Sequence, residues 1–206
     1  MYSRPERLAD GTIHITGIVT SVVATVLLIL YAGAAGTGLD VAAVSVYGAM
    51  AILAFTASAF YHMTPWGRIR PLLQRIDHAA IYLKIAGTYT PLVVILGGAF
   101  AYGVLGLIWI VALIGAVGKL TEWLKPGVVS TWLYVAMGWA SVVLIVPLVS
   151  QVPGLALWFM VMGGVLYTIG AAINHWQTLR FNVAIWHAIV LVASGLFCAA
   201  IVLSIG

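Results

Sequence analysis

The sequence contains few charged residues. Asp, Glu, Lys and Arg make up 7% of the 206 residues, whereas 64% of the residues are hydrophobic. A soluble fold cannot cover so much apolar surface with so few polar side chains. This shortage excludes a water-soluble protein and indicates that lipid surrounds most of the chain. The formal net charge of +4 therefore reflects membrane topology, and we predict no nucleic-acid partner.

Cysteine is almost absent from the sequence. Cys198 is its single cysteine, and it lies in the middle of the last apolar run. One cysteine cannot form a disulfide framework within the chain. It also excludes a metal site built from several cysteines.

Long apolar runs, in contrast, fill the sequence. A helix needs about 20 apolar residues to cross the hydrocarbon core of a bilayer. Seven such runs lie near residues 13–33, 41–61, 76–97, 101–119, 130–149, 155–173 and 183–203. We therefore predict an all-α integral membrane protein, in which residues 1–206 form a single seven-transmembrane-helix bundle.

The basic residues occur in alternate connections between these runs. They are Arg4 and Arg7 before the first run, Arg68, Arg70 and Arg75 after the second, Lys119 and Lys125 after the fourth, and Arg180 after the sixth. Short loops that carry Lys and Arg stay on the cytoplasmic side. This distribution predicts a cytoplasmic N-terminus and a C-terminus outside.

Polar residues cluster at the predicted cytoplasmic ends of three helices. Ser58 and His62 are four residues apart and share one face of the second helix. Asp77 and His78 open the third helix, and His187 lies near the start of the seventh. Two imidazoles, a carboxylate and an open position match a zinc site that activates water. The alternative is a set of ordinary polar residues at the headgroup boundary.

Three further ionisable residues are candidates for supporting roles. Lys84 is a basic residue within a predicted span, so it must find a polar partner, extend toward water or be neutral. His14 follows Asp10 by four residues at the start of the first helix and is a weaker candidate. His175 is expected in the last inner loop, in contact with water.

Several motifs in these regions resemble those of the hemolysin III family. This family is the bacterial branch of the progestin and adipoQ receptor and alkaline ceramidase-like superfamily, and the resemblance covers essentially the whole chain. The motifs that carry it are Ser58–His62, Asp77–Tyr82, Ala86–Pro91, Tyr134–Trp139 and Asn182–His187.

The resemblance implies a seven-helix fold with a zinc site inside a bacterial inner membrane. It implies that His62 is a zinc ligand, that Asp77 holds or activates the zinc-bound water, and that Ser58 is a polar support. With the count of ligands that catalytic zinc requires, we predict three metal ligands and two catalytic residues. The predicted ligands are His62, His187 and Asp77, the catalytic residues are Asp77 and Ser58, and the supporting residues are His78, Lys84 and His14.

One position departs from the family pattern. The seventh helix of the family usually carries His-x-x-x-His, but Val183 occupies the first of these positions here and only His187 is present. Another residue must complete the zinc shell, or zinc binds weakly or not at all. His78, His14 and His175 are the conceivable substitutes.

Three functions are compatible with these features. The first is a metal-dependent hydrolase that cleaves an amide or ester of a membrane lipid. The second is a pore-forming cytolysin, although the spans lack an evident polar lining. The third is a non-enzymatic regulator of membrane state. Membrane lipids are the expected partners in each case, and the sequence indicates no protein partner.

Overall fold

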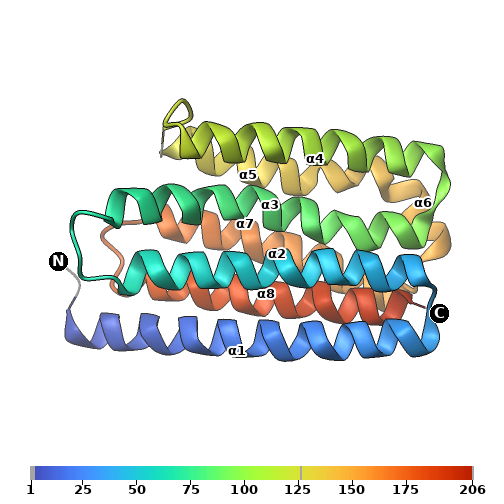
Figure 1. Cartoon of the computed structure of the whole chain (residues 1–206), viewed down its shortest axis with the longest axis horizontal. Helices are drawn as coiled ribbons and strands as arrows, with labels where there is room; N and C mark the ends of the chain where they lie inside the picture. The colour runs from blue at the N-terminus through green and yellow to red at the C-terminus, as the bar shows by residue number, and fades with distance from the viewer. Residues whose placement is uncertain (1–2, 126, 206) are drawn as a thin grey trace.

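A computed structural model describes residues 3–125 and 127–205, and Figure 1 shows its helices lying side by side. The described part of the chain forms helices joined by short connections and contains no strand. The helices are α1 (Arg4–Ala35), α2 (Gly38–Met63), α3 (Arg70–Leu96), α4 (Gly98–Leu120), α5 (Val128–Trp139), the 3-10 turn η1 (Ala140–Leu144), α6 (Ile145–Gln151), α7 (Gly154–His175) and α8 (Asn182–Ser204).

These helices confirm the seven predicted spans. Seven segments of the described chain are long and apolar enough to cross a membrane, and α5, η1 and α6 together make up the fifth. The two ends of the chain lie at opposite ends of the bundle, as an odd number of spans requires (Figure 1). The basic residues of the alternate connections gather at the N-terminal end. That this end faces the cytoplasm remains a prediction.

The helix α3 lies at the centre of the bundle. It packs against α2, α4, α5 and α8, and its apolar segment is the most buried of the seven. It is also the least apolar of the spans, because a central helix is shielded from lipid by its neighbours. Asp77, Tyr82 and Tyr89 of this helix are buried.

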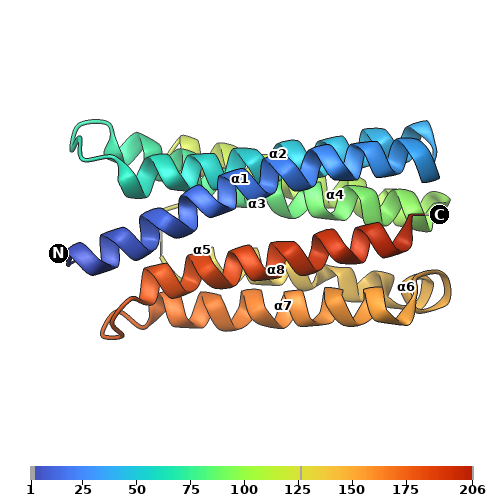
Figure 2. The same cartoon turned by 90° about the horizontal axis from the view of Figure 1, so that it is seen from below.

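The first helix closes the bundle between α2 and α8, which it contacts on either side (Figures 1 and 2). Ser3 and Glu6 form a capping box at its start, with the Ser3 backbone N–H donating to Glu6 Oε2 over 2.7 Å. The other carboxylate oxygen, Oε1, accepts from the backbone N–H of Phe181, just before α8, over 3.2 Å. Glu6 therefore links the starts of α1 and α8.

The interruption of the fifth span has a cause in the sequence. Pro147 lacks a backbone N–H, and its ring conflicts with the carbonyl four residues earlier, at Val143 inside η1. Tyr89 of α3 hydrogen bonds to the carbonyls of Met137 and Gly138 just before the turn, over 2.9 and 2.8 Å. The Tyr89 hydroxyl thus joins the central helix to the end of α5.

Gly17 permits the close approach of α1 to α2. A Cβ atom at this position would lie 2.7 Å from Cδ1 of Phe55, so we expect Gly17→Val to destabilise the fold by about 1–3 kcal/mol. The matched control is Gly33→Val on the same helix, where a Cβ would meet no described atom within 4 Å. Thermal unfolding in detergent tests this. Equal melting temperatures for the two variants would contradict the close contact of α1 with α2 at Gly17.

Candidate metal centre

Four potential metal ligands converge near the N-terminal end of the bundle. Asp10 and His14 of α1, His62 of α2 and His187 of α8 each offer a ligand atom, and these atoms all lie within 4.8 Å of one another. The three imidazole rings have centroid separations of 4.4 to 5.4 Å. The structure therefore brings the predicted ligands His62 and His187 together, with His14 as a third imidazole.

The Asp10 carboxylate contacts all three imidazoles. Its Oδ1 lies 2.6 Å from His187 Nδ1, and its Oδ2 lies 3.5 Å from His14 Nε2 and 3.7 Å from His62 Nδ1. His14 and His187 are buried, at 2% and 7% exposure. Such a compact group of nitrogen and oxygen donors, screened from water, has the chemistry of a zinc site.

One nitrogen atom of this group lacks a hydrogen bond. Nε2 of His14 is fully buried, and its 3.5 Å contact with Asp10 Oδ2 is too poor in geometry to count as a hydrogen bond, which leaves a buried polar atom weakly satisfied. Zinc bonds imidazole nitrogen at about 2.0–2.1 Å, so tetrahedral ligand atoms lie about 3.3 Å apart. The observed spacing needs only small side-chain shifts to reach this value. The residues present therefore fit zinc.

Local sequence and helix packing position the four side chains. Asp10 and His14 are four residues apart on α1 and share one face. His62 lies in the last turn of α2, and His187 lies in the second turn of α8. Ser58, one turn before His62, has its Oγ 3.4 Å from His187 Nε2. This contact joins α2 to α8 directly beside the cluster.

Asp77 lies close to this cluster but is not one of its four members. It is buried, with 8% exposure, and interacts with Ser58. Ser58 thus lies between Asp77 and His187. That Asp77 is a direct metal ligand stays a prediction. Its place beside the cluster suits a role next to a metal ion held there. His78, on the same turn, is outside the cluster. The third helix was expected to begin at Asp77 and His78, but α3 begins seven residues earlier, at Arg70.

The remaining candidates occupy other parts of the bundle. Lys84 donates a 2.7 Å hydrogen bond to Ser194 Oγ of α8, so it has a polar partner other than Asp77. His175 is the last residue of α7, where its Nδ1 lies 3.0 Å from the Ala171 carbonyl oxygen. The expectation that His175 lies in a loop was therefore wrong, because α7 extends further than the apolar run. Among the conceivable substitutes for the missing ligand, His14 alone joins the cluster.

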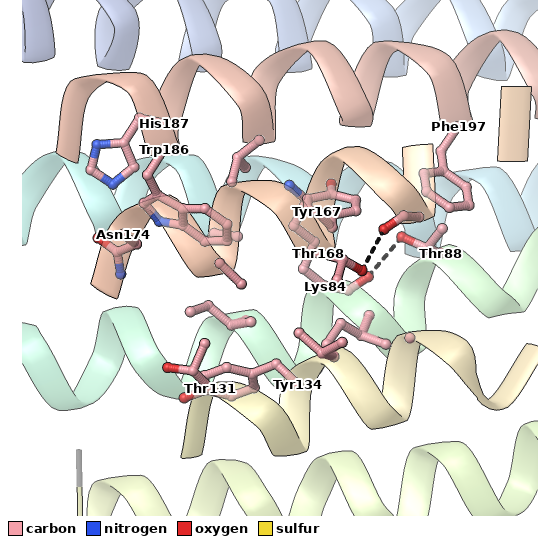
Figure 3. A pocket seen from close by; sticks show the side chains of 18 of the residues that line it. Lys84, Thr88, Thr131, Tyr134, Tyr167, Thr168, Asn174, Trp186, His187 and Phe197 are labelled. Atoms are coloured by element: carbon pink, nitrogen blue, oxygen red, sulfur yellow. Dashed lines mark hydrogen bonds between the residues drawn. The ribbon is translucent and has the colours of Figure 1, made fainter. Parts of the chain in front are cut away.

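A large cavity extends from the cluster along the inside of the bundle. Its volume is about 790 Å³, and its walls come from α1, α2, α3, α5, α6, α7 and α8. The three imidazoles and Asp77 line it. In Figure 3, His187 lies at the left and Phe197 at the right, and Lys84 and Tyr167 lie between them. Most of the wall is apolar, but polar side chains of several helices also line it, among them Lys84 and Gln74 of α3, Ser130 and Thr131 of α5, and Asn174 of α7.

A second hollow of about 420 Å³ reaches the cluster from the end of the bundle. Asp10 and His62 contribute to it, together with the basic residues Arg7 and Arg70. Val183 lines both the hollow and the cavity. The cluster therefore lies between a polar route at the end of the bundle and the long cavity within it.

Asp10 is the member that sequence reasoning did not propose as a ligand. Its spacing of four from His14 was the available signal. The pair carries no information about which helices lie next to α1, because apolar patterning alone does not order seven helices in a bundle. The contacts of α1 with both α2 and α8 supply that information.

Fold and site together define a multi-pass α-helical membrane protein with a histidine and aspartate cluster that could hold a metal ion. The profile of the family described as "Haemolysin-III related" matches residues 3–198. The chain belongs to this family.

Two relatives in Bacillus species support this assignment. The "Hemolysin-3 homolog" of Bacillus subtilis (strain 168) is 32% identical over 201 residues, which cover 96% of this chain and 94% of the relative. The "Hemolysin-3" of Bacillus cereus is 37% identical over 196 residues, which cover 94% of this chain and 90% of the relative. The resemblance found in the sequence motifs is thereby confirmed.

Proposed function

We propose that this protein is a zinc-dependent hydrolase of the bacterial inner membrane, which cleaves an amide or ester bond of a membrane lipid. One observation carries the proposal: three imidazoles, two of them buried, and a carboxylate meet at one end of a long, mostly apolar cavity inside the bundle. Catalytic zinc sites combine three protein ligands with an open position. A lipid lying in the cavity would present its polar linkage to that position.

His14, His62 and His187 are the residues proposed to hold the metal. Asp10 then orients the rings, because a 2.6 Å contact between its Oδ1 and His187 Nδ1 is the outer-shell bond that zinc-ligating histidines usually make with carboxylates. When bound, zinc polarises a carbonyl group and activates water. A structural role for the metal would instead use all four residues as ligands.

Asp77 is proposed to accept and return a proton at the reacting linkage. Its carboxyl group lines the cavity beside the cluster and is shielded from bulk water. Ser58 interacts with Asp77 and has its Oγ 3.4 Å from His187 Nε2, so it lies between the carboxyl group and the imidazoles. General acid and base groups within such reach contribute about 10²–10⁴-fold to a rate.

The two hollows suit the two parts of a lipid. The apolar walls around Leu92, Leu148 and Leu157 can accommodate an acyl chain. The hollow with Arg7 and Arg70 can admit water and the polar part of the lipid. The linkage between the two parts would then lie at the cluster.

Release of fatty acid tests the proposal. The purified protein, reconstituted in vesicles, is incubated with amide-linked and ester-linked lipids, and free fatty acid is measured by mass spectrometry. We expect zinc-dependent release that stops when a chelator removes the metal. No release from either lipid class by the zinc-loaded protein would reject the hydrolase.

The same vesicles distinguish the other two functions. Leakage of trapped ions, with no hydrolysis, would favour a pore-forming cytolysin. If neither leakage nor hydrolysis occurs but the order of the lipids changes, a regulator of membrane state is favoured.

A further inference from the structure

A lysine side chain also lines the large cavity, seven residues along α3 from Asp77. Lys84 lines the cavity there, about 10 Å from Asp77 along the helix axis at 1.5 Å per residue. A lysine at this depth is costly in a membrane unless it is paired or meets water. Its surroundings therefore indicate what the cavity binds.

Hydrogen bonds to Ser194 hold the Lys84 ammonium group in place. Lys84 Nζ donates to Ser194 Oγ over 2.7 Å, and the Tyr167 hydroxyl lies 2.9 Å from the same oxygen. Ser194 donates its own proton to the Val190 carbonyl over 2.6 Å. Ser194 is thus an acceptor from both neighbours, which makes it a positioning residue and not a nucleophile.

Two aromatic rings lie beside the Lys84 amino group. Its Nζ lies 4.6 Å from the centroid of the Phe55 ring and 5.4 Å from that of Tyr167, which are favourable but partial compensations. Within residues 3–125 and 127–205, Lys84 forms no ion pair with a carboxylate. An ammonium group has three donors, and Ser194 uses one of them.

From these contacts we infer that Lys84 is an anion site inside the cavity, and that it binds the carboxylate of a long-chain fatty acid. Leu92 lies about 12 Å further along α3 from Lys84, and Leu148, Leu157 and Phe197 also line the cavity. These apolar residues can accommodate the acyl chain of the fatty acid. The inference rests on the proposed use of the cavity as a lipid site but requires neither metal nor catalysis.

Binding of a fluorescent polyene C18 fatty acid tests this inference. The full-length protein in lipid nanodiscs is titrated with the acid and with the corresponding alcohol, for the wild type and for Lys84→Met and Lys84→Arg. Losing a charge-assisted hydrogen bond costs about 1.5–3 kcal/mol, so we expect Lys84→Met to weaken acid binding about 10- to 100-fold. Binding of the alcohol should change little, and Lys84→Arg should retain most of the acid binding.

Two further measurements keep the inference separate from the metal site. Metal content should be the same in Lys84→Met and the wild type, and the metal-free wild type should still prefer the acid to the alcohol. Loss of that preference on chelation would place the carboxylate at the metal and overturn the inference. Equal affinity of Lys84→Met and wild type for the acid would also overturn it. If Lys84→Met does not fold, the wild type is titrated with the acid and with its methyl ester. Equal affinity for these two ligands would overturn the inference.

Discussion

His14→Ala is expected to remove the bound metal from the purified protein. The variant deletes one of three imidazoles and leaves no nearby nitrogen to replace it, since His78 and His175 lie outside the cluster. Loss of an outer-shell partner alone lowers metal affinity about 10- to 100-fold, so loss of a ligand should lower it more than 100-fold. Zinc titration against a competing chelator measures the affinity.

Two variants serve as controls for this result. His175→Ala removes an imidazole at the end of α7, away from the cluster, and should bind zinc as the wild type does. Val183 precedes His187 by one helical turn and lines both hollows. His14→Ala combined with Val183→His should therefore regain zinc affinity, because it restores a third imidazole on the same face of α8. Unchanged zinc binding by His14→Ala would exclude His14 as a ligand.

Asp77→Asn is expected to abolish hydrolysis while the metal remains bound. An amide of the same shape can accept a hydrogen bond but cannot take up the proton, so we expect the rate to fall about 10²–10⁴-fold. Zinc affinity should change little, because Asp77 is not among the four clustered residues. Fatty-acid release and metal content, measured on one preparation, test both expectations.

A matched carboxylate at the opposite end of the bundle provides the control. Asp40 belongs to the capping box at the start of α2, and Asp40→Asn should retain full activity. If Asp77→Asn instead loses its metal together with its activity, Asp77 is a ligand and the assignment of a proton-transfer role is wrong. If Asp77→Asn keeps its activity, Asp77 has no chemical role.

Most of the fold follows from the sequence. The seven apolar runs are separated by polar or Gly and Pro residues, and a bilayer admits few alternatives to helices for such runs. The same reasoning explains why His62 and His187 were expected at one membrane depth. Their helices run in opposite directions, and each residue lies near the end that carries basic connections. The depth of a residue in the membrane can therefore be predicted from its distance to the end of its span.

The lateral order of the helices could not be read in this way. Asp10 and His14 share the depth of His62, but depth does not reveal that α1 lies between α2 and α8. That placement depends on side-chain packing, such as Phe55 against Gly17. It also depends on the hydrogen bond that the Phe181 backbone N–H donates to the Glu6 carboxylate. The structure thus offers an explanation for Val183: the third imidazole comes from another helix.

Metal analysis of the wild-type protein tests the central claim most directly. The protein is purified without chelators, supplied with zinc, freed of excess metal and examined by elemental analysis and X-ray absorption. We expect about one zinc ion per chain, bound by imidazole nitrogen and oxygen and by no sulfur. A protein that is folded but holds no zinc, or one whose zinc lacks imidazole ligands, would contradict the account.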